Sequence, residues 1–143
     1  LSSALADLGL ADALDEVKLL IRRNFHQEVP GMVQFVGELA DSYRLVLISD
    51  HAREWIEYIE ANHSFLHDFF RRFYSFQLGS TKASPETFQK VLGEIDRNPA
   101  ECILVDDNTG NVAVAASVGM RGVVFVGEAE LRSELRKLRI IAE

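Results

Sequence analysis

Four short apolar runs alternate with longer segments of helical periodicity, and this alternation limits the folds open to the chain. The runs predict strands at residues 45–48, 73–78, 102–105 and 122–126. The first of them, Leu-Val-Leu-Ile, contains no polar residue, which is typical of a parallel strand covered by helices on both faces of a sheet. Because consecutive strand, helix and strand units form right-handed crossovers, the sequence predicts an α/β fold with a doubly wound parallel sheet.

Helices are expected between these strands and at both ends of the series. Apolar spacing predicts them at residues 30–39, 52–70, 84–95, 109–118 and 128–141. Ser84 followed by Pro85 is a favourable N-cap with proline in the first turn. A further stretch of helical spacing, Leu5 to Phe25, precedes the alternating region.

The composition is that of an ordinary globular domain. The 143 residues are 48% hydrophobic and 26% charged, which is enough for a sizeable core. A formal net charge of -7 argues against a nucleic-acid partner and against an anionic membrane surface. No apolar run approaches the roughly 20 residues of a membrane span. The single cysteine, Cys102, has no partner for an internal disulfide, so we expect a cytoplasmic location.

Two adjacent carboxylates end the third predicted strand. Asp106 and Asp107 follow an apolar run and precede a helix. In open parallel sheets ligands bind beyond the carboxyl ends of the strands, and paired carboxylates there suit Mg²⁺. The alternative is that one of them only caps the helix beginning near Thr109, because Asp is a favoured N-cap residue. The dipeptide alone leaves both interpretations open.

Three more candidate residues fall at the same edge of the predicted sheet. Ser49 and Asp50 end the first strand, and Lys82 lies directly before the helix opened by Ser84. A hydroxyl, an ammonium group and paired carboxylates are the parts of a Mg²⁺-assisted phosphoryl-transfer site. Plainer interpretations exist for each: Ser49 and Asp50 can form a turn and N-cap, and a single lysine is usually solvated.

These residues carry a resemblance to the haloacid dehalogenase-like hydrolases. The string CILVDDNTGNVAVAASVGMRGVVF closely resembles the acidic motif of that family, and the likeness extends from about Pro30 onward. It implies that Asp107 is the principal carboxylate for Mg²⁺ and that Asp106 assists directly or through water. It also implies that the Lys82 ammonium pairs with the attacking carboxylate and the phosphate.

The resemblance assigns the first strand end to phosphate binding, with departures from the usual pattern. Ser49 matches the Ser or Thr whose hydroxyl binds a phosphoryl oxygen in the family. Asp50 and His51 stand where the family more often has Asn or Gly and a small residue. An acidic Asp50 beside a bound phosphate would be repulsive unless a cation or His51 offsets it. Lys82 to Pro85 keeps the lysine and final proline of the usual Lys-Pro-Asp-Pro.

The family's nucleophile segment is not found in this sequence. It is an N-terminal strand ending in Asp-x-Asp, placed centrally between the strands that here end in Ser49 and Asp106. We therefore expect the chain, which begins at Leu1, to be a piece of something longer. A missing N-terminal segment or a second chain would complete the sheet. Without it, we expect the chain to be poorly stable and inactive.

The resemblance also predicts two parts and leaves more than one function open. Residues 1–28 resemble the tail of a small helical cap of the subfamily I type, and residues 29–143 the α/β core without its first strand. The preferred function is a Mg²⁺-dependent phosphatase acting on a small phosphorylated metabolite. The alternatives are a 2-haloacid dehalogenase-type hydrolase and a catalytically inactive binding or assembly module.

Two other patterns are weaker. His63 and His67 have the i, i+4 spacing that can chelate zinc on a helix, but no third ligand is apparent. The run ending in Asp106-Asp107 also looks like the first strand of a response-regulator receiver domain. That domain needs about four further strand-helix units, and too little sequence follows Asp107 to form them.

Overall fold

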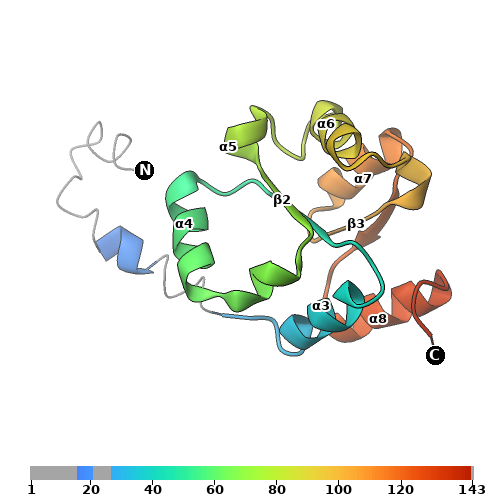
Figure 1. The fold of residues 1–143 in the computed structure, drawn as a ribbon, viewed down its shortest axis with the longest axis horizontal. Helices are drawn as coiled ribbons and strands as arrows, with labels where there is room; N and C mark the ends of the chain where they lie inside the picture. Colours follow the sequence, from blue (N-terminus) through green and yellow to red (C-terminus); the bar gives the residue numbers. More distant parts are fainter. Residues whose placement is uncertain (1–15, 21–26, 143) are drawn as a thin grey trace.

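The computed structural model describes residues 16–20 and 27–142 (Figure 1). Residues 16–20 are helical. The elements that follow are α3 (Met32–Ala40), β1 (Val46–Ser49), α4 (Arg53–Asn62), the 3₁₀ helix η2 (Ser64–Asp68), β2 (Arg71–Tyr74), α5 (Ser75–Leu78), α6 (Pro85–Ile95), the 3₁₀ turn η3 (Pro99–Glu101), β3 (Ile103–Asp106), α7 (Thr109–Ser117), β4 (Arg121–Val124) and α8 (Glu128–Lys137).

The strands form two parallel pairs. β1 pairs with β2, placing Ser49 opposite Tyr74, and β3 pairs with β4, placing Asp106 opposite Val124. Strands and helices alternate, so the predicted α/β class with parallel strands is confirmed. Within the described part of the chain, β1 and β3 are not paired with each other, and the sheet is divided at that point.

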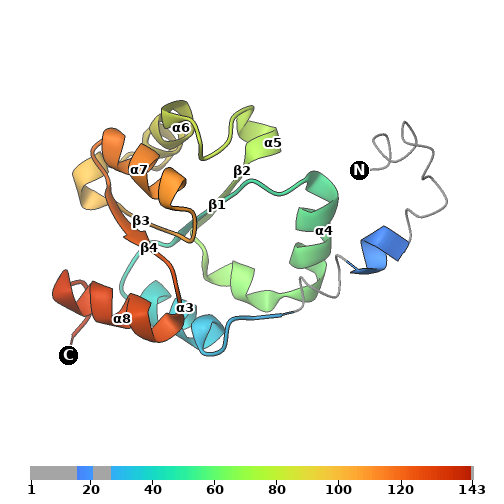
Figure 2. The ribbon, with the colours of Figure 1, turned by 180° about the vertical axis from the view of Figure 1, so that it is seen from behind.

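Two apolar clusters hold helices against the second pair of strands. Phe35, Val123, Leu131 and Leu135 are buried together where α3 and α8 pack on one side of β4. Phe88, Leu104 and Ala115 are buried on the other side, beneath α6 and α7. Figure 2 shows these two helix layers above and below β3 and β4. Ile48 of β1 also packs against the second cluster, which brings β1 close to β3 without a ladder.

The helix predicted after β1 ends well before its sequence pattern indicates, and β4 and α8 also end a few residues early. The helix expected over 52–70 stops at Asn62, because His63 has an extended backbone with φ −129° and ψ 116°. The chain then forms the separate 3₁₀ helix η2. His63 and His67 consequently do not share an α-helix, and no group of three His, Cys, Asp or Glu side chains in the described residues could hold a metal ion.

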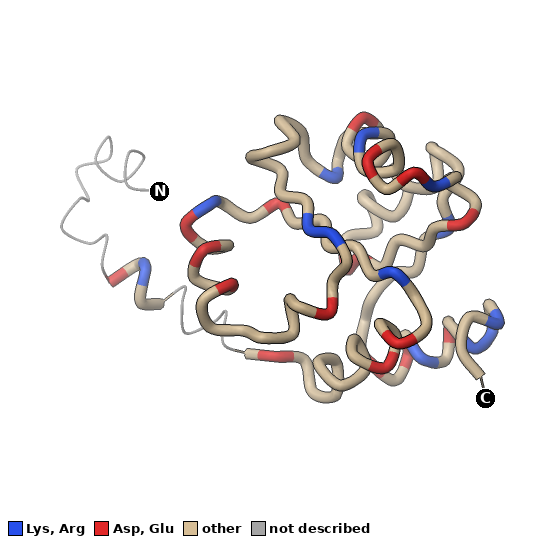
Figure 3. The backbone as a smooth tube through the Cα atoms, in the orientation of Figure 1, with Lys and Arg blue, Asp and Glu red and all other residues tan. Residues whose placement is uncertain are grey.

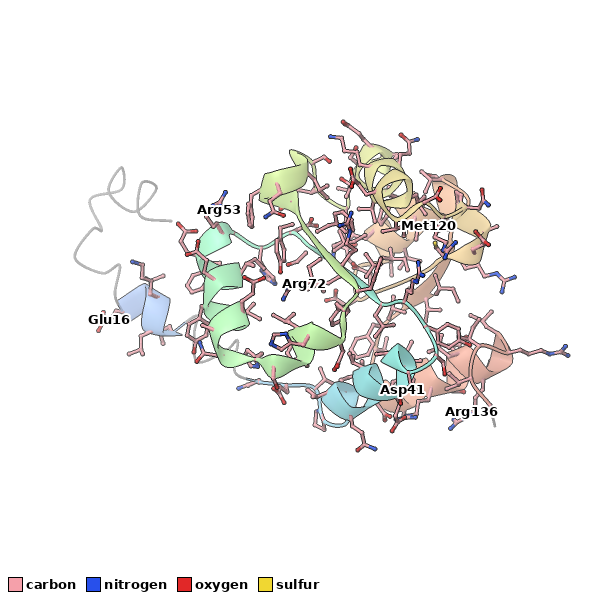
Figure 4. The ribbon with its side chains drawn as sticks, viewed as in Figure 1. Glu16, Asp41, Arg53, Arg72, Met120 and Arg136 are labelled. Atoms are coloured by element: carbon pink, nitrogen blue, oxygen red, sulfur yellow. The ribbon has the colours of Figure 1, made fainter. Side chains whose placement is uncertain are left out.

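The predicted strand at 73–78 is shifted. The ladder begins at Arg71, and the chain turns into the short helix α5 directly after Tyr74. The start of this strand could not be predicted from an apolar run, because Arg71 and Arg72 are charged and exposed. Arg72 belongs to β2, and its guanidinium lies 3.6 Å from the carboxylate of Glu60 on the acidic helix α4 (Figures 3 and 4).

The predicted cap remnant, residues 1–28, lies outside the described residues except for 16–20, 27 and 28. The division into residues 1–28 and 29–143 therefore stays a prediction. None of the described helices combines the length and the apolar character needed to cross a bilayer.

Candidate active site

The candidate site is built at the carboxyl ends of β1 and β3. Ser49 is the last residue of β1 and is only 8% exposed, while Asp106 is the last residue of β3 and 6% exposed. A buried hydroxyl and a buried carboxylate at strand ends need polar partners, because an unsatisfied buried polar group is costly. Those partners come from the loops that follow the strands.

Lys82 is brought to Asp106 across 24 positions of sequence. Its Nζ lies 2.6 Å from Asp106 Oδ2, and the two side chains are 16% and 3% exposed. A charge-assisted hydrogen bond with this little exposure is screened weakly by solvent. The structure thus places two of the predicted site residues in direct contact.

Asp106 is held by two further donors. Its Oδ1 accepts the backbone N–H of Asn108 at 2.9 Å and the Asn111 side-chain amide at 3.0 Å. Burial alone would raise the pKa of Asp106, but the bonds from Lys82, Asn108 and Asn111 and the Lys82 charge outweigh it and hold the pKa below its usual value. Asp106 is therefore ionised at neutral pH.

Asp107 differs from Asp106 in its exposure and in its partners. It is exposed, and its carboxylate makes no hydrogen bond or ion pair with the described residues. Helix α7 is capped by Asn108, whose Oδ1 accepts the Gly110 N–H at 2.8 Å, so neither aspartate is the cap. An open carboxylate beside a buried one fits Mg²⁺, which takes one or two carboxylates and keeps several waters.

The residues after Ser49 are engaged with the same loop. The Asp50 carboxylate accepts the backbone N–H of Lys82, with distances of 3.2 Å to Oδ1 and 3.3 Å to Oδ2. The N-cap of α4 is Ala52, so Ser49 and Asp50 do not serve as that cap. The backbone N–H of His51 lies 3.4 Å from Ser49 Oγ.

His51 does not neutralise Asp50. Burial lowers the pKa of the His51 imidazole, the charge of Lys82 lowers it further, and Asp50 only partly opposes them. The ring is therefore neutral at pH 7.

The loop carrying Lys82 is anchored from α6 as well. Thr87 is fully buried, and its hydroxyl lies 2.6 Å from the Thr81 carbonyl and 2.7 Å from Ser80 Oγ. The Thr87 hydroxyl has one proton, which it donates to the Thr81 carbonyl. It therefore accepts a hydrogen bond from the Ser80 hydroxyl. The sequence analysis did not single out Thr87 as a residue of this site. The signal for Thr87 was a polar residue one helical turn before the core residue Val91.

Comparison with known proteins identifies a family for this chain. A family model described as haloacid dehalogenase-like hydrolase matches residues 2–119. Flavin mononucleotide hydrolase 1 of Arabidopsis thaliana is 36% identical over 62 residues, 43% of this chain and 25% of that protein. The sesquiterpene phosphatase astK of Aspergillus oryzae is 40% identical over 60 residues, 42% of this chain and 31% of that protein. The chain thus spans about a quarter to a third of these relatives.

Solved structures share the fold at low identity. A predicted haloacid dehalogenase-like hydrolase from Porphyromonas gingivalis superposes with a TM-score of 0.69 at 21% identity, covering 80% of this chain and 59% of that one. An enzyme of the same family from Bacteroides thetaiotaomicron, solved as a magnesium complex, gives 0.67 at 20% identity, covering 73% and 56%. Because the family model matches more than half of the chain and the fold agrees with it, this chain belongs to the haloacid dehalogenase-like hydrolases.

Proposed function

We propose that this chain carries the phosphate- and metal-binding half of a Mg²⁺-dependent phosphatase site for a small phosphorylated metabolite. The observation that carries the proposal is the contact between Lys82 Nζ and the buried Asp106, at the strand edge that also holds Ser49 and the open Asp107. The nucleophilic carboxylate would be supplied by an inserted strand between β1 and β3, from a preceding segment or from a second chain.

Each residue has a separate task in this scheme. The Ser49 hydroxyl would donate a hydrogen bond to a phosphoryl oxygen. Lys82 would place its ammonium between that phosphate and the attacking carboxylate, where it opposes the charge that develops during transfer. Asp106 keeps the ammonium in place, because it is ionised and buried against it. Asp107, assisted by Asp106, would hold Mg²⁺, which supplies charge neutralisation on the phosphate when bound.

The relatives favour phosphate chemistry over dehalogenation. One is named as a flavin mononucleotide hydrolase and another as a sesquiterpene phosphatase. The Bacteroides thetaiotaomicron enzyme was also solved with magnesium and inorganic phosphate. These names support a phosphorylated small molecule as the substrate class, and Mg²⁺ as the cofactor.

To test the proposal, a strand ending in Asp-x-Asp is added to the chain and the hydrolysis of a phosphate ester is measured. An apolar strand ending in Asp-x-Asp is joined to residue 1 by a flexible linker, and release of p-nitrophenol from p-nitrophenyl phosphate is followed with Mg²⁺ and with EDTA. We expect activity only with Mg²⁺ and only when the first Asp of the added motif is intact. Lys82→Ala should lower kcat by about 100-fold or more, as removal of an electrostatic group at a reacting oxygen does.

Lys137→Ala is the matched control. Lys137 lies on α8 and pairs with Glu134 at 2.6 Å on an exposed face, so its removal should leave kcat unchanged. If the chain with the added strand folds but neither hydrolyses p-nitrophenyl phosphate nor binds inorganic phosphate, the result would instead support the alternative of a non-catalytic binding or assembly module. Halide release from a 2-haloacid, without phosphate release, would favour the dehalogenase alternative.

A further inference from the structure

Asp50 occupies a position where a carboxylate would oppose phosphate binding. It directly follows the buried Ser49, and the neighbouring His51 ring is neutral at pH 7, so no adjacent imidazolium offsets its charge. The Asp50 carboxylate is directed at a different partner, the backbone N–H of Lys82, with both oxygens within 3.3 Å of the nitrogen.

Lys82 is thereby held at both of its ends. Its backbone nitrogen is bound by Asp50, which follows β1, and its Nζ is bound by Asp106, which ends β3. β1 and β3 belong to separate strand pairs, so Lys82 connects the two halves of the divided sheet. On the α6 side, Thr87 binds the carbonyl of the preceding residue, Thr81. The freedom of the Lys82 backbone is therefore restricted by contacts from both neighbouring elements.

We infer that Asp50 is a positioning residue for Lys82 and does not bind the phosphate. Its carboxylate sets where the Lys82 backbone lies, and this in turn sets where the ammonium can reach. The consequence for phosphate binding rests on the proposed function, whereas the effect on the Lys82 backbone does not. An experiment can therefore disprove the effect on the Lys82 backbone and the effect on phosphate binding independently of each other.

Replacing Asp50 with asparagine separates the effect of its hydrogen bond to Lys82 from the effect of its negative charge. The Asn side chain keeps an oxygen that can accept the Lys82 N–H, but it removes the negative charge. Asp50→Ala removes both. If Asp50 acts by positioning the Lys82 backbone, Asp50→Asn should keep the slow Lys82 exchange and the phosphate affinity that Asp50→Ala loses. If Asp50 acted on phosphate only through its charge, Asn and Ala would behave alike.

The first measurement is amide hydrogen exchange at Lys82 in the full 143-residue chain, followed by NMR. We expect Asp50→Ala to accelerate exchange at Lys82 by about three- to tenfold relative to residues in β3, the range for loss of one hydrogen bond. Asp50→Asn should keep the exchange slow. Asp41→Ala is the control, because it removes the same charge from the exposed end of α3. Unchanged exchange in Asp50→Ala, or equally fast exchange in Asp50→Asn, would overturn the inference.

The second measurement is the affinity for inorganic phosphate, by titration calorimetry with Mg²⁺ present on the strand-supplemented chain. Asp50→Ala should weaken binding several-fold, and Asp50→Asn should bind at least as tightly as the parent. In a Lys82→Ala background, Asp50→Ala should have no further effect, because Asp50 acts through Lys82. Additive losses would overturn the positioning role. Absence of phosphate binding by the parent would overturn the proposed function, while the exchange result would still decide the role of Asp50.

Discussion

At the scale of single residues, the pair formed by Lys82 and Asp106 has the largest expected effect on stability. Both side chains are mostly buried, and Asp106 accepts three hydrogen bonds. Breaking a buried pair from one side leaves the other charge poorly compensated. We predict that Asp106→Asn lowers the free energy of unfolding at pH 7 by about 1–3 kcal/mol, the scale of hydrogen bonds to a charged group. Urea denaturation measures it.

The effect of Asp106→Asn on stability should also depend on pH. The pKa of Asp106 is lower in the folded chain than the unfolded value of about 3.9, so its contribution is present above that value. It is lost as the pH falls through the folded pKa. The stability difference between the parent and Asp106→Asn should therefore narrow below about pH 4. Asp107→Asn, at an exposed carboxylate, should change stability little at either pH. A difference independent of pH would show that the carboxylate charge is not responsible.

The sequence predicted where the candidate site residues lie better than it predicted their partners. Ser49 and Asp106 could be placed at one edge of the sheet because apolar runs show where strands end, and parallel strands present those ends at one edge. Lys82 could be placed there because it directly precedes the helix start marked by Ser84 and Pro85. The contact of Asp50 with the Lys82 backbone spans 32 positions. Such a contact depends on how the two loops approach in three dimensions, which neither periodicity nor capping preference contains.

At the scale of elements, α7 lies very close to β4 at Gly122. A Cβ atom placed on Gly122 would lie 2.4 Å from Val112 Cγ1 and 3.4 Å from the Val112 carbonyl oxygen. Val112 is β-branched, so its side chain has little freedom to move aside. We predict that Gly122→Ala destabilises the chain by about 1–3 kcal/mol, the usual cost of overpacking. Thermal unfolding would measure the loss.

Two further variants test that explanation. Val112→Ala in the Gly122→Ala background should recover part of the lost stability, because it removes the atom that the new methyl group meets. Gly93→Ala is the control: nothing lies within 4 Å of its added Cβ, and it sits inside α6. It should be stabilising by about 0.5–1 kcal/mol through helix propensity. Equal effects at positions 93 and 122 would contradict the packing argument.

Element boundaries depended on how clearly the sequence alternates. Strand β3 and helix α6 were predicted to within one residue, because an uninterrupted apolar run and a serine-proline start mark them. Strand β2 was misplaced. Phe73, Tyr74, Phe76 and Leu78 suggest one continuous strand, but only the first two belong to the ladder. The others lie in α5, where four residues are too few to show helical periodicity.

At the scale of the whole molecule, the divided sheet explains why apolar surface remains exposed. Val105, in the middle of β3, is 39% exposed, although strands in a doubly wound sheet are normally covered on both faces. The facing edges of β1 and β3 also offer unpaired backbone groups in the described residues. Composition and periodicity could predict the parallel class. The division of the sheet was expected only through the resemblance, because periodicity does not show which strands pair.

A strand supplied between β1 and β3 should therefore stabilise the chain before any catalysis is considered. Binding to the folded state raises its stability by mass action, and pairing on both edges protects the amides of β1 and β3 from exchange. We predict a higher midpoint of thermal unfolding for the linked strand, with slower exchange in both strands. The control carries proline at the centre of the added strand, where the missing N–H and the fixed ring prevent pairing. If the proline strand stabilises the chain equally, the gain comes from apolar contact alone, and the added strand does not join the two halves into one sheet.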